Sequence, residues 1–196
     1  MASRHLGPID VERIFLYEEN PRHEPIESQP EIIEHLCKDE QVYNLARDIA
    51  AAGPNPLELL GVVTIPGSSA KKSYQVWEGN RRVCALKLLN DPDLAPAHLR
   101  KDFARLGANY KPIKRINSVV FDDHDDLRYW MGIIHGGTQA GVGRLDWDSP
   151  QKERHGAVAE VVGIKCGVVS GVLNLESSGV EASDWRPRHE ERYHEA

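Results

Sequence analysis

The sequence predicts an α+β (mixed α/β) fold, and three observations support this prediction. Strand-like and helix-like patterns alternate along residues 9–135 without long gaps, which is typical of a mixed domain. At residues 74–89 an expected strand passes through a single glycine directly into an expected helix. The chain of 196 residues is 40% hydrophobic and 28% charged, which is the composition of a globular protein.

The first part of the domain contains one expected strand and two expected helices. Alternating apolar residues at 9–16 favour a half-buried strand. A proline suited to a first helical turn precedes a short helix over 31–36. A second helix is expected over 42–50, with Asp39 as its N-cap and Gly53 at its end.

The middle of the chain contains the most informative junction. The apolar run at 59–65 is typical of a buried strand, and residues 74–78 alternate like a half-buried one. Gly79 follows at once, and apolar residues at helical spacing over 81–89 predict a helix. A further strand and helix are expected at 114–121 and at about 123–135.

Charge and cysteine content narrow the class of protein. Twenty-four basic and 30 acidic side chains give a net charge of -6, which argues against binding nucleic acid through bulk charge. Cys37, Cys84 and Cys166 stand alone in sequence, so they predict neither a disulfide framework nor a paired metal motif. No apolar run reaches the roughly 20 residues of a membrane helix, and no signal-like stretch follows the N-terminus. We expect a cytoplasmic protein without membrane insertion.

The glycine between strand and helix creates the elements of an anion site. The first N–H groups of a helix lack internal partners, and the helix dipole favours negative charge there. Gly79 lets a phosphate approach closely, and Arg81 and Arg82 supply bidentate donors. Alternatively, both arginines are ordinary solvated residues at the start of a helix.

Other catalytic signatures are sparse. The sequence contains neither a Gly-x-x-x-x-Gly-Lys-Ser/Thr phosphate loop nor a His-Glu-x-x-His zinc helix. The acidic cluster at 122–126 either binds Mg²⁺ for phosphodiester cleavage or caps the next helix, and the frequency of Asp at helix starts favours capping. Trp130 and Trp147 are expected to be packing anchors, with base stacking as the alternative.

The order of these features resembles a known superfamily over residues 9–125. The features are Asn20-Pro21-Arg22, a helix ending near Gly53, a strand, and Gly-x-Arg-Arg-x-x-Ala at 79–85. This order resembles the ParB/sulfiredoxin superfamily, and in particular the ParB-like N-terminal (nuclease) domain of partition proteins. The resemblance implies a ParB/sulfiredoxin-like fold. It also implies a glycine-arginine turn that binds nucleotide phosphates, as in partition proteins with CTP and in sulfiredoxins with ATP.

The resemblance also implies roles for individual residues. The implied nucleotide-binding residues are Arg22, Gly79, Asn80, Arg81 and Arg82. Glu78, directly before the turn, becomes a candidate to hold a metal ion such as Mg²⁺ or to orient a water; the alternative is a strand-end carboxylate that faces solvent. The candidate catalytic residues are then Glu78, Arg81 and Arg82.

The sequence departs from the superfamily pattern at two places. Sulfiredoxins have their nucleophilic cysteine directly after the glycine of the turn, where this chain has Asn80. Cys84 is expected to be a small core residue, so sulfinic-acid reduction is not expected. Partition proteins carry Glu-Asn-x-x-Arg after a later helix, where residues 133–138 read Ile-Ile-His-Gly-Gly-Thr. His135 with its two glycines is either a substitute ligand or phosphate loop, or an ordinary helix stop.

The last part of the chain is expected to be an extension of the domain. The predicted divisions are a nucleotide-binding domain at 1–130, a mostly helical extension at 131–182 and a polar tail at 183–196. Residues 158–173 resemble a helix-turn-helix, which makes Lys165, together with Arg144, a candidate DNA contact. Glycines and valines in the supposed second helix favour instead a hairpin or a buried docking segment.

Two functions follow from this reading. In the first, the protein binds ATP or CTP, hydrolyses it, and acts on DNA as a nuclease. A stand-alone domain of this size resembles plasmid fertility-inhibition proteins, which interfere with DNA transfer; this implies a component of a conjugation or secretion system as a partner. In the second, the protein is a non-nucleolytic, CTP-gated DNA clamp or adaptor of the plasmid-partition type. A scaffold with a vestigial nucleotide site is a third, weaker interpretation.

Overall fold

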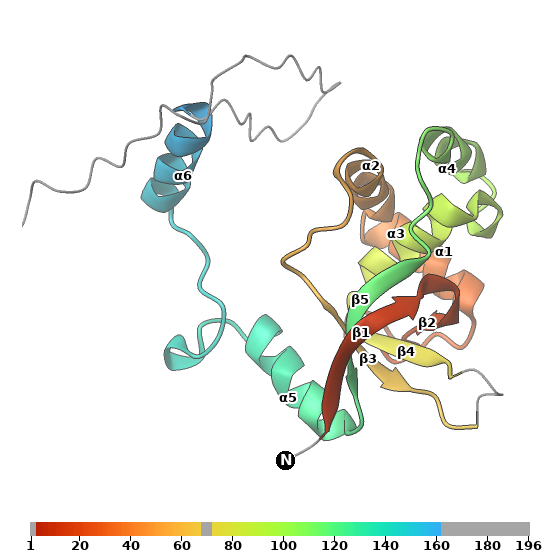
Figure 1. Ribbon diagram of the computed structural model, residues 1–196, viewed down its shortest axis with the longest axis horizontal. Helices are drawn as coiled ribbons and strands as arrows, with labels where there is room; N and C mark the ends of the chain where they lie inside the picture. Colours follow the sequence, from red (N-terminus) through yellow and green to blue (C-terminus); the bar gives the residue numbers. More distant parts are fainter. Residues whose placement is uncertain (1–2, 68–71, 162–196) are drawn as a thin grey trace, which may run out of the picture. The chain divides into compact units, whose positions relative to one another are not determined.

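The computed structural model describes residues 3–67 and 72–161 (Figure 1). The chain forms two compact units, Met1–Arg144 and Leu145–Ala196, which are described separately below. The first unit combines a five-stranded sheet with helices, so the predicted α+β class is confirmed. The division of the chain at residues 130 and 182 stays a prediction.

The sheet of the first unit is mixed. Its strands are β1 Arg4–Asp10, β2 Ile14–Leu16, β3 Leu60–Thr64, β4 Tyr74–Glu78 and β5 Arg115–Phe121. They lie in the order β1-β5-β3-β4-β2. β5 pairs antiparallel with β1 and parallel with β3, while β4 pairs antiparallel with β3 and parallel with β2. The strands predicted at 59–65, 74–78 and 114–121 are thereby confirmed.

The single strand predicted over 9–16 was wrong, because the chain makes two strands there. A 3-10 turn, η1 (Val11–Arg13), separates β1 from β2, and the two strands lie at opposite edges of the sheet. Val11 is buried in this turn, and its N–H donates to the carbonyl of Lys114 at 2.9 Å. Apolar alternation continues through the turn, and for that reason the pattern does not reveal the change of partner strand.

The helices of the first unit follow the predicted pattern with one addition. They are α1 Gln29–Asp39, α2 Val42–Ala52, α3 Asn80–Asn90, α4 Arg100–Gly107 and α5 His124–His135, with short 3-10 turns η2 Pro92–Leu94 and η3 Gln139–Gly141. The sequence did not predict α4, in which Phe103 is the buried residue. Asp39 is not the N-cap of α2: it is the last residue of α1 and pairs with His35 at 3.0 Å, and Gln41 caps α2 with φ of 54°.

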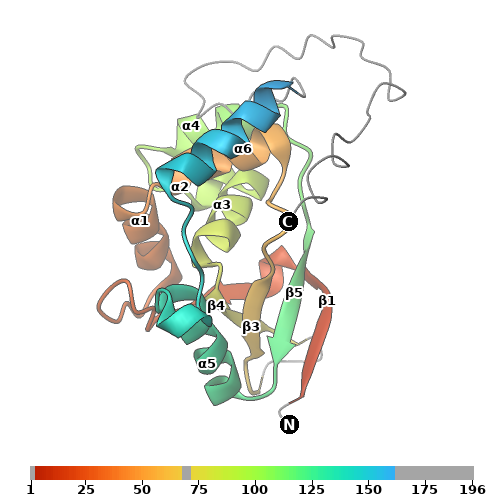
Figure 2. The ribbon, with the colours of Figure 1, turned by 90° about the vertical axis from the view of Figure 1, so that its left-hand side faces the viewer.

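The two faces of the sheet carry different cores. Helices α1–α4 cover one face, where residues such as Val62, Val76 and Val120 enter a large apolar cluster. The next residues along the same strands point to the other face and meet Leu127 of α5 in a small cluster of Val63, Trp77 and Phe121 (Figure 2). This alternation follows from the two-residue period of a strand, and it leaves α5 as the cover of the second face.

The second unit contains α6 Ser149–Val161 in its described part. Asp148 and Gln151 exchange hydrogen bonds at the start of this helix, since each side chain accepts from the other residue's N–H at 2.8–2.9 Å. Trp147 packs its ring against His155 at 4.9 Å between centroids. None of the helices within 3–67 and 72–161 has the length and apolar character to cross a membrane.

Candidate functional site

The turn between β4 and α3 requires glycine. Gly79 has φ of 102°, a left-handed conformation that disfavours side chains. A Cβ atom at this position would lie 2.3 Å from Leu60 Cδ2 and 3.1 Å from Arg82 Nη2. Leu60 is fully buried in β3 and has no room to shift. The glycine therefore lets β4 turn directly into α3 while remaining close to β3.

The first turn of α3 presents free backbone donors. The N–H of Val83 is the first to enter the helix, donating to the carbonyl of Gly79 at 3.0 Å. The N–H groups of Asn80, Arg81 and Arg82 precede it and find no acceptor among the described residues. These donors and the helix dipole make this end of α3 electropositive.

The side chain of Asn80 ties two loops together and is not free to meet a ligand. Asn80 is buried; its Oδ1 accepts from the N–H of Tyr17 at 2.9 Å and its Nδ2 donates to the carbonyl of Trp77 at 3.2 Å. These bonds hold the segment after β2 against the end of β4. Of Asn80, only the backbone N–H is therefore available for the predicted contact with phosphate.

Arg82 is also committed to internal contacts, which differs from its predicted role as a phosphate ligand. Its guanidinium donates to the carbonyls of Glu58 at 2.8 Å and Leu59 at 3.3 Å. It also forms ion pairs with Glu58 at 3.7 Å and with Glu78 at 3.4 Å. Arg82 is 9% exposed, and its donors hold the segment before β3 in place. We assign it a structural role.

Arg22 and Arg81 share one carboxylate. Arg22 Nη1 lies 3.3 Å and Arg81 Nε lies 4.0 Å from Oε2 of Glu40, at the end of α1. Arg81 Nε is buried without a hydrogen-bond partner, as is the second oxygen of Glu40. Two guanidinium groups therefore share one carboxylate, and Arg81 Nε remains an unused donor.

The backbone around Arg22 is itself ordered by local bonds. Asn20 is buried, and its Oδ1 accepts from the N–H of Arg22 at 3.0 Å. Its carbonyl accepts from the N–H of His23, also at 3.0 Å. The Asn20-Pro21-Arg22 segment thus forms a turn that carries Arg22 toward Glu40 and the start of α3.

Glu78 is neither free nor turned to solvent, so its predicted alternative as a solvent-facing carboxylate was wrong. Its Oε1 contacts Arg82, and its Oε2 lies 2.6 Å from Nε2 of His135. His135 is the last residue of α5, so this contact joins the end of α5 to the end of β4. Within the described part of the chain, no group of three or more His, Cys, Asp or Glu side chains could hold a metal ion. Since Mg²⁺ often needs only one or two carboxylates beside substrate phosphates, the role of Glu78 as a metal ligand stays a prediction.

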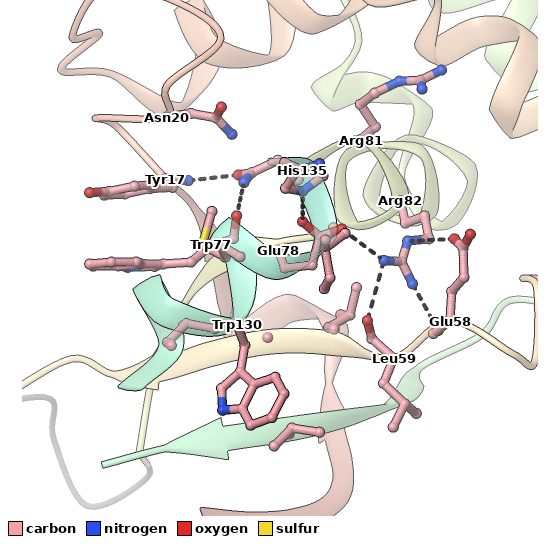
Figure 3. Close-up of a pocket in the computed structure, with 18 of the residues that line it drawn as sticks. Tyr17, Asn20, Glu58, Leu59, Trp77, Glu78, Arg81, Arg82, Trp130 and His135 are labelled. Carbon is pink, nitrogen blue, oxygen red and sulfur yellow. Dashed lines mark hydrogen bonds and ion pairs between the residues drawn. The ribbon is translucent and has the colours of Figure 1, made fainter. Parts of the chain in front are cut away.

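These groups line one cavity of about 1240 Å³ (Figure 3). The predicted residues that line it are Arg22, Glu78, Gly79, Asn80, Arg81, Arg82 and Arg144. Glu40, Glu58 and His135 add charged or titratable groups, and Trp130, Met131 and Ile134 of α5 add an apolar wall. The fold thus assembles, from distant parts of the chain, the turn, the Asn-Pro-Arg segment and the end of α5.

Aromatic side chains around the cavity have two kinds of role. Trp77 is buried and stacks on Tyr17 with centroids 4.7 Å apart, and burial raises the pKa of Tyr17. Trp130 is 39% exposed, and Trp147 of the second unit is 52% exposed. Both residues are thus partly exposed, while Trp147 also packs on His155 and Trp130 on Tyr129, so their role as packing anchors stays a prediction.

The acidic cluster after β5 has the expected capping role. Asp123 Oδ1 accepts from the N–H of Asp125 at 2.9 Å and caps α5. Asp126 pairs with Arg4 at 2.7 Å and accepts from Trp130 Nε1 at 3.2 Å. The favoured capping interpretation is confirmed. Cys84 is fully buried in the main core, as expected.

Of the two predicted DNA contacts, the structure describes one. Arg144 is exposed and lines the cavity. Lys165 lies outside the described residues, as does most of the supposed helix-turn-helix at 158–173. The polar tail at 183–196 also lies outside them.

Sequence reasoning missed several residues of the site. Glu40 carries no motif, and only the packing of α1 against α3 brings it to Arg81. Glu58 and its neighbouring carbonyls, which hold Arg82, lie in an irregular segment without a pattern. The signal for His135 was its position at the end of a helix, followed by two glycines, and its partner could not be read from the sequence.

Comparisons with known proteins include a similarity to a solved structure. No protein-family model and no curated protein sequence matches the chain. The fold is similar to the crystal structure of the C-terminally truncated chromosome-partitioning protein ParB from Caulobacter crescentus complexed with CTP-gamma-S, with a TM-score of 0.44 and 17% sequence identity. The match covers 79% of this chain and 62% of that ParB chain, so this chain spans less than two thirds of it.

Proposed function

We propose that this protein binds a nucleoside triphosphate, ATP or CTP, in the cavity beside α3. The observation that carries the proposal is the convergence of unused donors on one cavity. The free N–H groups of Asn80, Arg81 and Arg82 begin α3, and the guanidinium groups of Arg22 and Arg81 flank the same space.

The charge of the site suits a polyphosphate. Arg22 and Arg81 share Glu40 as their only acidic partner among the described residues, so one positive charge is unmatched. Arg81 Nε is a buried donor without a hydrogen-bond acceptor, and such a group gains most from an added oxygen. Phosphate oxygens accept from arginine and from helix N-terminal amides alike.

The size and walls of the cavity suit the rest of a nucleotide. At about 1240 Å³ it exceeds what a triphosphate group needs. Trp130 and Ile134 expose apolar surface on its α5 side, where a planar base can stack. The choice of ATP or CTP rests on the sequence resemblance to the ParB/sulfiredoxin superfamily.

Nucleotide binding is tested by calorimetry with the four nucleoside triphosphates, with and without Mg²⁺. We expect Arg81→Ala and Arg22→Ala each to weaken binding about 10- to 100-fold, because a charge-assisted bond to phosphate is lost. Arg105→Ala is the matched control, because Arg105 lies on α4 with its side chain 75% exposed and outside the cavity.

The wild-type protein failing to bind any triphosphate at millimolar concentration would contradict the proposal. Equal losses in the Arg105 variant would also contradict it, since binding would then depend on overall charge and not on this site.

We further propose that the protein hydrolyses the bound nucleotide and acts on DNA, as the resemblance implies. Its size and motif resemble the plasmid fertility-inhibition protein Osa, so interference with DNA transfer through a conjugation or secretion system is the cellular role proposed.

A non-nucleolytic, CTP-gated DNA clamp or adaptor is the second candidate. It is favoured by one observation: both carboxylate oxygens of Glu78, the candidate metal ligand for DNA cleavage, are already engaged by Arg82 and His135. Incubating supercoiled plasmid with the protein, nucleotide and Mg²⁺ separates the two candidates, since only a nuclease converts the plasmid to nicked or linear DNA.

A further inference from the structure

An imidazole and a carboxylate form a close pair in the wall of the cavity. His135 Nε2, at the end of α5, lies 2.6 Å from Glu78 Oε2, at the end of β4 (Figure 3). The two residues are 57 positions apart in sequence. Their contact therefore depends on the docking of α5 on the second face of the sheet.

Glu78 is held rigidly behind the histidine. Its other oxygen, Oε1, accepts from Arg82 Nη2 at 3.4 Å. Arg82 is in turn fixed by the carbonyls of Glu58 and Leu59. Three side chains thus form a chain of contacts, from the buried Arg82 through Glu78 to His135.

The pairing determines which nitrogen of His135 can accept a proton. An ionised carboxylate only accepts hydrogen bonds, so Nε2 carries the hydrogen in this contact and Nδ1 keeps its lone pair. Within the described residues, Nδ1 has no hydrogen-bond partner, and the side chain is 45% exposed where it lines the cavity.

The pair also lies beside the place proposed for the phosphates. Glu78 is followed by Gly79 and then by the free amides of α3, so its partner His135 stands next to the helix N-terminus. Figure 3 shows Glu78 joined by dashed lines to His135 and to Arg82.

We infer that His135 is the general base for hydrolysis of the bound nucleotide and that Glu78 is its positioning residue. The inference rests on the proposed nucleotide binding. A water oxygen attacks the γ-phosphorus; the new P–O bond forms as the bond to the bridging β–γ oxygen breaks. Nδ1 of His135 takes the proton of the water, and the nucleoside diphosphate leaves with the bridging oxygen. The carboxylate of Glu78 stabilises the imidazolium until the proton passes to solvent.

The first test separates turnover from binding. We expect His135→Gln to lower kcat about 10²- to 10⁴-fold, the range of a general base, while the Kd for the triphosphate changes less than about threefold. His124→Gln is the matched control: it removes a histidine from the first residue of the same helix, outside the cavity, and should leave kcat unchanged.

The second test uses chemical rescue and conservative change. In His135→Gly, added imidazole should restore a measurable part of kcat, because the side chain position is open to solvent. Glu78→Gln should lower kcat at nearly constant Kd, and Glu78→Asp should recover part of that loss. A purely structural role for the pair predicts neither rescue nor recovery.

Two outcomes overturn the inference. One is a wild-type protein that binds triphosphate but does not hydrolyse it; the other is a folded His135→Gln variant with wild-type kcat. Both leave the proposed binding site intact. Absence of nucleotide binding, in contrast, refutes the proposed function and the inference together.

Discussion

Two adjacent arginines at the start of α3 have opposite roles. Arg82 is 9% exposed and uses its guanidinium on Glu58, Leu59 and Glu78. Arg81 has a side chain that is 40% exposed, with a loose contact to Glu40 at 4.0 Å. Consecutive residues on a helix face different directions, so although both line the cavity, Arg82 reaches the segment before β3 and Arg81 reaches Glu40.

Replacing each arginine should separate stability from binding. Arg82→Ala should lower the free energy of unfolding by about 2 kcal/mol or more, because buried carbonyl and carboxylate groups lose their donor. Arg81→Ala should change it by less than about 0.5 kcal/mol. Urea denaturation followed by circular dichroism measures both. A destabilisation of similar size in the two variants would contradict the structural role of Arg82.

At the scale of elements, α1 and α3 meet through a pair of cysteines. Cys37 is half-buried on α1, and Cys84 is fully buried on α3. A hydrogen bond with Cys84 lowers the pKa of Cys37, and the same bond, together with burial, raises the pKa of Cys84. The contact lies one helical turn from both Glu40 and Arg81, on the same two helices.

This pairing predicts unequal reactivity of the thiols. A lowered pKa leaves more thiolate at neutral pH, so Cys37 should react with iodoacetamide at a lower pH than an ordinary thiol of pKa about 8.5. Cys84 should react only after unfolding. Peptide mass spectrometry at several pH values resolves each site, and labelling in guanidinium provides the control. Faster native labelling of Cys84 than of Cys37 would be inconsistent with this packing.

The helices and strands also show which features of the fold can be predicted from the sequence. The strand–glycine–helix junction at Gly79 was predictable because its pattern is local. The break between β1 and β2 was not, since it depends on which strands each segment pairs with. Likewise, the anchoring of Arg82 depends on carbonyls of a segment without pattern, and Glu40 reaches Arg81 only through tertiary packing.

At the scale of the whole molecule, the cavity belongs to the first unit alone. All residues that line it lie within Met1–Arg144, as does the main apolar core. Leu145–Ala196 contains Lys165 and the segment proposed to contact DNA. The proposed nucleotide site and Lys165 therefore lie in different units, whereas Arg144, the other candidate DNA contact, belongs to the first unit.

A chain ending at Arg144 tests this assignment. We expect it to bind triphosphate with the affinity of the full chain, because every cavity residue is retained, and to lose affinity for duplex DNA. Calorimetry and a gel-shift assay measure the two, with circular dichroism to verify folding. A folded truncated chain that no longer binds nucleotide would show that the second unit completes the site.

The placement of β1 and β2 has a consequence for self-association. One short stretch of chain supplies both outermost strands of the sheet, β1 beside β5 and β2 beside β4. If a protease cut after Leu16 and the N-terminal stretch were lost, the outer backbone amides and carbonyls of β5 and β4 would both be unpaired. Each could then pair with another copy of the chain. The N-terminal stretch thus determines which strands form both edges of the sheet.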